Sequence, residues 1–256
     1  MASIGDKKFN NCQHLEMEII EIIDSKKVKI RFVDSGYEAI VYTGNFLKGN
    51  VKDKISIKNK KYNRYGYVGS ESKNVKKDKA YSYWLHMIRR TCDIDFKNEH
   101  RNLAYKDCDV CDEWLNYSNF KKWFDKNYYE CPFGGKMCLD KDILHKGNKI
   151  YSPENCCFVP NNINVAFLKQ KYHKNKNIPI GSKQIKLKNG KFKYIVRVTE
   201  HGKEHHVGVF YSKQEAFMAY KEEKERYLKE LAELYKPYIP QRVYKAMIDY
   251  EVEDND

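Results

Sequence analysis

The spacing of hydrophobic residues changes twice along this chain, and that change limits the folds open to it. Over residues 9–69, β-branched residues gather in the short runs MEIIEII, KVKIRFV and YEAIVYT, separated by polar turn residues. From Tyr81 the spacing becomes three and four, as at Trp84 and Met87, which is typical of helices. Beyond Ile180, alternating strands return. Because the β and α stretches are separate, we expect an α+β chain.

Three domains follow from this segmentation. We expect a small, basic β domain over 1–72, a central module over 80–172 and a three-stranded sheet with a helix over 180–248. The first domain should end near the Gly/Tyr-rich NRYGYVGS and the charged linker ESKNVKKDK. It fits a nucleic-acid-binding module and a structural mini-domain equally well. The central module should hold helices near 80–92 and 113–127, with the tryptophans forming a local core.

Charge indicates the kind of partner. The chain carries 48 Lys and Arg against 35 Asp and Glu, a formal net charge of +13, which attracts polyanions such as nucleic acids. The alternative is a Lys-rich chain that is merely well solvated. No run approaches the roughly 18 apolar residues of a membrane span, and MASIGDKKFNN lacks the apolar stretch of a signal peptide. We therefore expect a cytoplasmic protein without membrane contact.

The most informative stretch is CLDKDILHKGNKIYSPENCCFVPNNIN, residues 138–164. Asp140 ends a predicted strand, a turn with Gly147 follows, and Asn155 precedes Asn164 by nine residues. This pattern resembles the HNH, or ββα-metal, nuclease motif. The upstream text YWLHMIRRTC and VCDEWLNYSNFKKWF resembles the helical lead-in of phage HNH homing endonucleases, so the resemblance runs from Trp84 to Asn164. It implies a central ββα-metal module.

The resemblance also implies roles for individual residues. Asp140 and Asn164 match the metal ligands, and Asn155 matches the residue that pins the hairpin loop. Oxygen ligands suit Mg²⁺ or Mn²⁺, which would neutralise charge at the cleaved phosphate. The implied activity is therefore metal-dependent hydrolysis of phosphodiester bonds in double-stranded DNA.

One position departs from the motif, because Lys141 stands where the family has its histidine base. A lysine is normally protonated at pH 7 and acts as a base only where burial or nearby cations lower its pKa. Asp142 or His145 are the substitutes, although a continuing strand would direct Asp142 away from Lys141, and His145 would need the loop to fold back. Two functions therefore remain open, a working nuclease and a DNA-binding protein with a degenerate core.

The eight cysteines lack a secretion signal and indicate thiols or metal ligands rather than disulfides. Cys108 and Cys111 form a C-x2-C pair, and zinc-stabilised HNH domains often use two such pairs. The second pair is missing, since Cys156 and Cys157 are adjacent. Buried structural thiols are favoured, with zinc at Cys108 and Cys111 as the alternative.

The C-terminal part predicts a sheet backed by a helix. KQIKLKNGKFKYIVRVTEHGKEHHVGVFYS contains three alternating strands, joined by Asn-Gly at 189–190 and His-Gly at 201–202. A helix with Ser212 as its N-cap should cover Lys213–Ala232. The acidic tail, Asp249–Asp256, is expected to fray.

Residues 185–232 resemble the DNA-binding domain of plant ethylene-response factors (APETALA type), which phage HNH endonucleases also carry. The resemblance implies that the sheet lies in the major groove, where alternate strand residues contact phosphates and base edges. Arg197 is the best single choice, because a guanidinium binds guanine bidentately. The alternative is that these charges form only the solvated face of the sheet. The DNA-binding candidates are Lys191, Lys193, Tyr194, Arg197 and His205.

Overall fold

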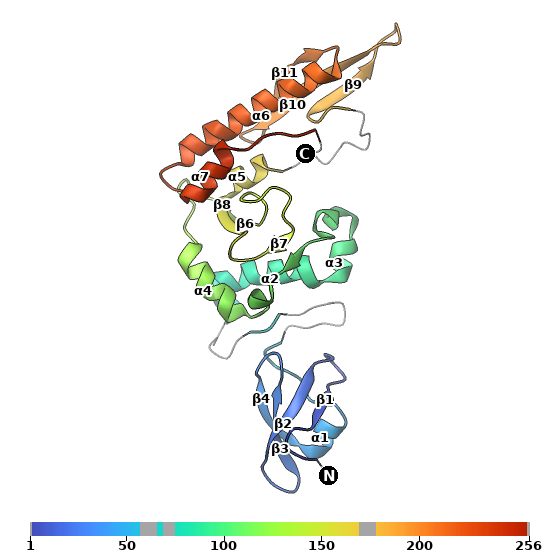
Figure 1. The fold of residues 1–256 in the computed structure, drawn as a ribbon, viewed down its shortest axis with the longest axis vertical. Helices are drawn as coiled ribbons and strands as arrows, with labels where there is room; N and C mark the ends of the chain where they lie inside the picture. Colours follow the sequence, from blue (N-terminus) through green and yellow to red (C-terminus); the bar gives the residue numbers. More distant parts are fainter. Residues whose placement is uncertain (1, 57–65, 69–74, 169–177, 255–256) are drawn as a thin grey trace. The chain divides into compact units, whose positions relative to one another are not determined.

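A computed structural model describes residues 2–56, 66–68, 75–168 and 178–254 (Figure 1). Most of the expected boundary segment NRYGYVGS and ESKNVKKDK lies outside the described residues. The chain forms two compact units: unit 1 is Met1–Tyr128 with Lys149–Asn155, and unit 2 is Tyr129–Asn148 with Cys156–Asp256. The α+β class is confirmed, because an antiparallel sheet occupies the N-terminal part and a three-stranded sheet with a helix the C-terminal part.

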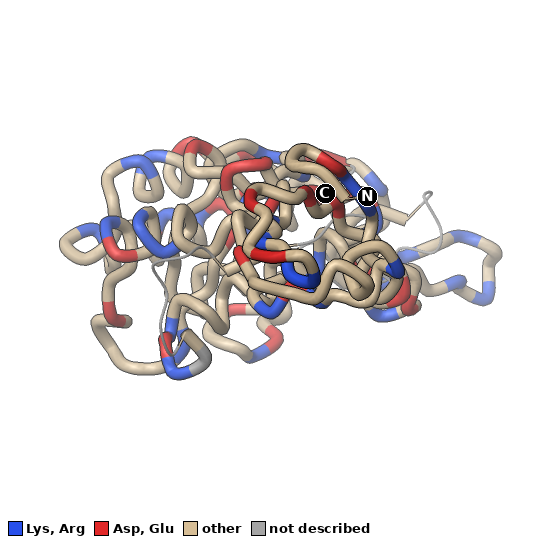
Figure 2. The backbone as a smooth tube through the Cα atoms, turned by 90° about the horizontal axis from the view of Figure 1, so that it is seen from below, with Lys and Arg blue, Asp and Glu red and all other residues tan. Residues whose placement is uncertain are grey.

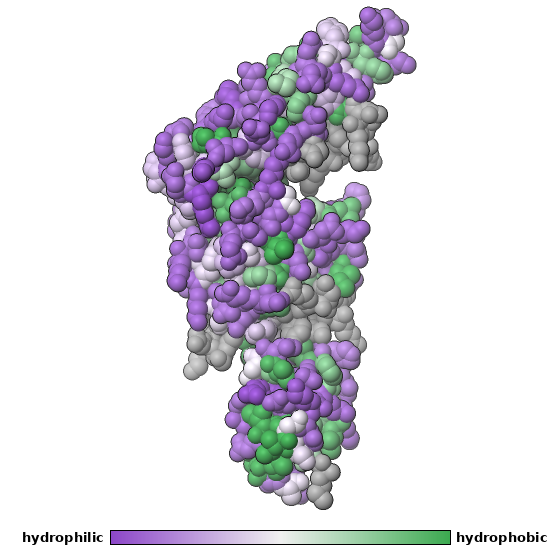
Figure 3. All heavy atoms as spheres, viewed as in Figure 1, coloured by the Kyte–Doolittle hydropathy of each residue, from purple (hydrophilic) through white to green (hydrophobic). Residues whose placement is uncertain are grey.

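The N-terminal sheet of unit 1 contains the three strands that the sequence predicted and one more. Its antiparallel strands, in spatial order, are β1 (Lys7–Phe9), β2 (Glu16–Ile22), β3 (Lys27–Phe32) and β4 (Glu38–Tyr42), followed by α1 (Thr43–Leu47). Alternate side chains point inward, so Met17, Ile30 and Phe32 are buried. On the opposite face Ile40 and Tyr42 are exposed. Figure 3 shows such hydrophobic groups among hydrophilic residues on this part of the chain.

The rest of unit 1 is largely helical. Its elements are η1 (Val75–Lys77), α2 (Lys79–Cys92), α3 (Ile94–Asn98), η2 (His100–Tyr105), β5 (Asp109–Val110), η3 (Asp112–Leu115), α4 (Tyr117–Asn127) and β7 (Ile150–Tyr151), with β5 and β7 parallel. Helices α2 and α4 confirm the two predicted helices. Trp84 Nε1 donates to the Trp114 carbonyl at 2.7 Å, and Trp123 packs on Trp114 at 4.7 Å between ring centroids. The tryptophans are therefore scaffold, as expected.

Unit 2 begins with a small ββα element. Strand β6 (Met137–Asp140) pairs antiparallel with β8 (Cys157–Pro160), and α5 (Asn161–Ala166) follows β8 at once. The helix contacts both strands. Asp140 thus lies at the end of β6, as the sequence predicted, and opposite Cys157 in the ladder.

The second part of unit 2 is the C-terminal sheet and its helices. In spatial order the antiparallel strands are β11 (Lys203–Phe210), β10 (Phe192–Glu200) and β9 (Ser182–Lys186), followed along the chain by α6 (Lys213–Tyr235) and α7 (Gln241–Ile248). Ser212 Oγ accepts from the Glu215 amide at 3.4 Å, which confirms the predicted N-cap. Helix α6 continues three residues beyond the predicted end because Tyr235 is still buried.

Helix α6 belongs to two hydrophobic cores. Its first half contributes Ala216 and Tyr220 to the core of the three-stranded sheet. Its second half contributes Leu228 and Leu231 to the core beneath the ββα element, which also contains Ile163. One helix of 23 residues, about 35 Å long, therefore supports both parts of unit 2.

The acidic C-terminal segment does not fray over residues 249–254, contrary to the expectation from its charge. Val252 is 4% exposed, and its amide donates to Glu225 Oε1 at 2.8 Å. Lys221 Nζ donates to the Val252 carbonyl at 3.1 Å, and the Tyr250 ring packs on Phe167. The segment lies along α6 because Val252 is buried and Tyr250 is half-buried among the acidic residues.

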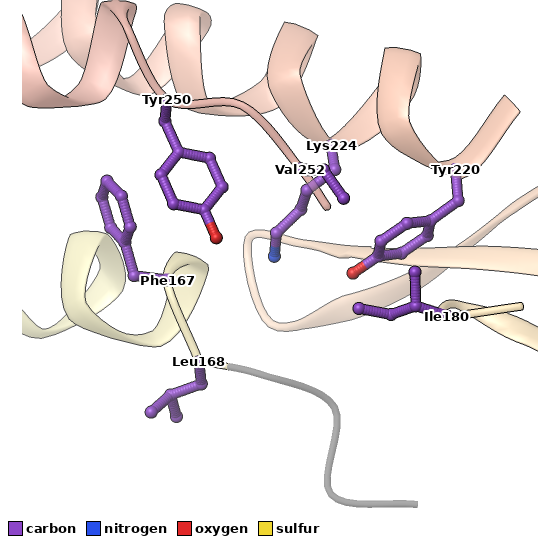
Figure 4. Close-up of a pocket in the computed structure, with 7 residues that line it drawn as sticks. All are labelled: Phe167, Leu168, Ile180, Tyr220, Lys224, Tyr250 and Val252. Atoms are coloured by element: carbon purple, nitrogen blue, oxygen red, sulfur yellow. The ribbon is translucent and has the colours of Figure 1, made fainter. Parts of the chain in front are cut away.

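Beside this segment unit 2 contains a small pocket (Figure 4). The side chains of Tyr220, Lys224 and Tyr250 extend towards it from α6 and from the C-terminal segment. Its free volume of about 10 Å³ has room for one water molecule. The pocket is therefore a packing feature of unit 2.

Candidate nucleic-acid interface and metal site

The turn after β6 fixes the position of Asp140. Its Oδ1 accepts from the backbone amides of Asp142 and Ile143, both at 2.8 Å, so the carboxylate closes the turn at the strand end. The Asp140 side chain also lies within hydrogen-bonding reach of the Asp142 carboxyl group. The turn therefore brings two carboxyl groups together at the end of β6.

Burial and, to a smaller extent, the neighbouring Asp142 carboxylate together raise the pKa of Asp140 to about 6. The two amides that donate to Oδ1 oppose the shift. Two carboxyl groups that lie this close together would both be attracted to a divalent cation, and this pairing is the observation that fits a metal here.

Lys141, at the motif's histidine position, is buried and paired. It is 7% exposed, its Nζ lies 3.4 Å from Asp142 Oδ2, and its carbonyl accepts from Asn148 Nδ2 at 2.7 Å. Because β6 ends at Asp140, the continuing strand that would direct Asp142 away from Lys141 is not present. An ammonium group has no lone pair, so Lys141 in this ion pair supplies a cation and not a base.

His145 and Asn164 belong to the loop and the helix of the same element. His145 is exposed in the loop after β6, and its carbonyl accepts from the Asn148 amide at 2.9 Å. Asn164 is half-buried on α5. Three residues earlier, Asn161 Oδ1 accepts from Cys138 Sγ at 3.4 Å. Residues at i and i+3 share a helix flank, so we expect Asn164 on the flank of α5 nearest β6.

Asn155 makes local contacts in unit 1, whereas Asp140 and Asn164 lie in unit 2. Asn155 Nδ2 donates to the Ile150 carbonyl at 3.4 Å, and its amide donates to Ser152 Oγ at 3.4 Å. These bonds hold the turn between Ile150 and Asn155. They suit a residue that shapes a loop rather than one that takes part in chemistry.

The donor set at the end of β6 suits a hard cation. Asp140 and Asp142 offer carboxylate oxygens there, and Asn164 carries an amide oxygen on α5. Mg²⁺ commonly takes one or two protein oxygens, with water and phosphate completing its shell. In the described ranges no three His, Cys, Asp or Glu side chains gather into a metal-holding group. A metal at this position would therefore depend on Asp140 with an amide oxygen or a second carboxylate.

The C-x2-C pair lies in unit 1 and is well enclosed. Cys108 is buried, with its Sγ 3.6 Å from the Ala104 carbonyl, and Cys111 is half-buried. Burial raises the pKa of the Cys111 thiol, which favours the neutral form over the thiolate that binds zinc. These contacts are those of structural thiols.

The C-terminal sheet divides the predicted DNA-binding residues between its two faces. On β10, Tyr194, Val196 and Val198 are buried towards α6, while Lys193 and Arg197 point to the other face. Tyr194 is 4% exposed, so its assignment to a DNA-binding surface is corrected. Its hydroxyl accepts from Gln184 Nε2 at 3.1 Å, and the residue belongs to the core.

A register shift moves His205 away from the outer face as well. Between Val196 and Arg197 the β10–β11 ladder slips, so Arg197 pairs with His206, and Val198 pairs with His205. His205 therefore faces α6, with Nε2 3.4 Å from Glu223 Oε1. Strand alternation thus predicted the wrong histidine for the face of Arg197, where the ladder places His206. The signal was Gly208, since a glycine inside a strand often marks a bulge.

The outer face combines cations with β-branched side chains. Arg197 is 52% exposed and pairs with Glu204 at 2.8 Å, and the exposed Lys191 lies in the turn before β10. Lys183 on β9 pairs with Ile195 and so shares this face, although alternation on β10 alone did not reveal it. Figure 2 shows the Lys and Arg positions interspersed with acidic ones along the backbone. We call the following residues the outer face: Lys183, Ile185, Lys193, Ile195, Arg197, Thr199, Glu204, His206 and Val209.

No protein-family model, curated protein or solved structure matches this chain. Among the described residues no helix is long and apolar enough to cross a membrane.

Proposed function

We propose that this chain binds double-stranded DNA and hydrolyses its phosphodiester bonds at the ββα element, with Mg²⁺ or Mn²⁺ as cofactor. The observation that carries the proposal is the sequence β6–β8–α5. It supplies two antiparallel strands and a helix packed on both, with Asp140 at the end of the first strand and Asn164 on the helix. The ββα-metal resemblance implied this order of elements and these positions.

DNA binding would be the task of the outer face. Its lysines and Arg197 would contact phosphates and base edges, with Arg197 able to donate two hydrogen bonds to one guanine. Phosphate contacts release counterions, so binding should weaken steeply between 50 and 200 mM salt. The protein would then act inside a bacterial host cell, as a bacteriophage or mobile-element protein.

In this proposal Asp140 and Asn164 hold the cation, which neutralises charge on the phosphate when it is bound. The turn amides of Asp142 and Ile143 keep the Asp140 carboxylate in place. His145 is the imidazole on the loop after β6, and an imidazole suits proton transfer near neutral pH. Lys141 supplies positive charge beside Asp142.

A second function is favoured by one observation. The buried Lys141, paired with the half-exposed Asp142, occupies the position of the family's histidine base. A protein of this kind would bind DNA through the outer face and leave it uncut. It would act as a regulator with a degenerate nuclease core.

Nicking of supercoiled plasmid separates the two functions. Wild type, Asp140→Ala and Asn164→Ala would be compared in Mg²⁺, in Mn²⁺ and in chelator. Glu222→Gln is the control, because it removes one exposed carboxylate from α6. The proposal expects metal-dependent nicking by wild type and the control and loss of nicking in both site variants. Equal nicking by Asp140→Ala would contradict the metal assignment.

A further inference from the structure

Helix α7 is fixed against the ββα element. Val243 and Met247 are fully buried in the core that also contains Ile143, Cys157 and Val159. These two residues are one helical turn apart and therefore anchor the same face of α7. This packing also holds Arg242, the residue before Val243 on α7, close to β8.

Arg242 reaches the backbone directly before β8. Its Nη2 donates to the Cys156 carbonyl at 3.0 Å, and the next residue, Cys157, faces Asp140 across the β6–β8 ladder. The charges of Asp140 and Arg242 both act on the Cys157 thiol: burial raises its pKa most, Asp140 raises it further and Arg242 lowers it. The guanidinium and the carboxylate thus lie near the same side chain.

The guanidinium is exposed and has donors to spare. One hydrogen bond to Cys156 uses one of its five N–H groups. Across the described parts of the chain no carboxylate lies within ion-pair distance of Arg242. By contrast, Arg226 on α6 contacts Glu200, Glu223 and Glu230. A surface arginine that is anchored but not neutralised has the form of an anion-binding group.

We infer that Arg242 binds a phosphate group of the DNA that occupies the ββα element, next to the phosphate held at Asp140. The inference rests on the proposed function and adds to it a residue from outside the HNH-like segment. Arginine suits this role because its planar fork donates to two phosphate oxygens at once. The hydrogen bond to the Cys156 carbonyl orients the guanidinium group before DNA binds.

The test uses the full chain with Arg242→Gln, Arg242→Lys and Arg242→Ala. Gln keeps a donor for the Cys156 carbonyl but removes the charge, which separates anchoring from phosphate binding. Lys229→Ala is the matched control, because it removes one exposed cation from α6. The buried residues of that helix, such as Leu228 and Leu231, are left unchanged. Thermal unfolding is recorded for each variant to confirm that it folds.

Two readouts are measured on each protein: plasmid nicking, and duplex binding as a function of salt. Nicking should fall about 100-fold in Arg242→Gln and Arg242→Ala, with partial recovery in Arg242→Lys. The slope of log affinity against log salt should decrease by about 1 in the variants that lack the charge, and stay unchanged in Lys229→Ala. Wild-type nicking and slope in Arg242→Gln would overturn the inference.

The two proposals fail in different ways. If the wild type binds DNA but does not nick it, the nuclease proposal fails, and Arg242 is then judged by the salt slope alone. A reduced slope in Arg242→Gln still supports a phosphate contact at the ββα element. An unchanged slope contradicts it.

Discussion

Arg197 pairs with His206 across β10 and β11, one position away from the partner that unbroken alternation would give it. This single slip decides which side chains share the outer face with Arg197 and which face α6. It places His206 on the outer face and His205 on the face towards α6, a difference that the sequence alone does not reveal.

The first prediction concerns these residues. Arg197→Ala should weaken binding to a selected duplex by about 1 to 3 kcal/mol, because a bidentate base contact is lost. His206→Ala should weaken binding less, and His205→Ala should leave it unchanged, since His205 faces Glu223. Affinities from fluorescence anisotropy at one fixed salt concentration measure all three. A larger loss for His205→Ala than for His206→Ala would contradict the register.

The second prediction concerns stability and pH. The pKa of Asp140 is raised to about 6 in the folded chain, so ionisation of this carboxyl opposes folding. Its contribution to stability is greatest below the unfolded pKa near 4 and is lost as pH rises to about 6. Asp140→Asn removes the charge. It should raise the free energy of unfolding at pH 7.5 by on the order of 2 kcal/mol while abolishing cleavage.

Chemical denaturation at pH 7.5 and pH 4.5 measures this difference. The gain from Asp140→Asn should shrink at the lower pH, where the wild-type carboxyl is already protonated. Asp254→Asn, on the exposed C-terminal segment, controls for the general effect of removing one negative charge. A destabilised Asp140→Asn at pH 7.5 would show that the carboxylate form is needed for the fold.

The third prediction follows from the two cores that share α6. Leu228 is fully buried beneath the ββα element, and Leu228→Ala should cost about 3 kcal/mol. Because α6 also supports the three-stranded sheet, hydrogen exchange should speed up in β10 as well as in β8. Leu234→Ala, at a position 49% exposed on the same helix, should change little. Loosening confined to the ββα element would show that the two parts unfold separately.

The fourth prediction concerns the C-terminal segment. Val252 is buried against the sheet core, so Val252→Ala should lower the stability of unit 2 by about 1 to 2 kcal/mol. Asp254→Ala, two residues later, should have no measurable effect. Thermal unfolding followed by circular dichroism makes the comparison. Equal melting of the two variants would mean that the segment frays after all.

Much of the fold could be predicted from the sequence because local signals agreed. The β-branched runs gave β2, β3 and β4, the Trp84 spacing gave α2, and Ser212 started α6 at the observed residue. Asp140 lies at its strand end, as predicted, and its side chain closes the turn by accepting a hydrogen bond from the Asp142 amide.

The errors arose where long-range packing outweighs local pattern. The bulge beside Arg197 inverted the face of His205, and the buried Val252 held a tail whose acidic residues predicted fraying. The hydrogen bond from Arg242 on α7 to the Cys156 carbonyl joins residues that are 86 positions apart. No spacing rule reaches that far along a chain, so these features needed the structure.

The most direct test of the account is cleavage of an end-labelled duplex that carries a site selected from random sequence by the full chain. With Mg²⁺ the account predicts cutting at one fixed offset from the selected site, because α6 joins the outer-face sheet to the ββα element. Asp140→Ala should bind this duplex and leave it intact. Binding without cleavage by wild type, with cutting only by Lys141→His, would contradict the nuclease proposal and identify a DNA-binding protein with an inactive core.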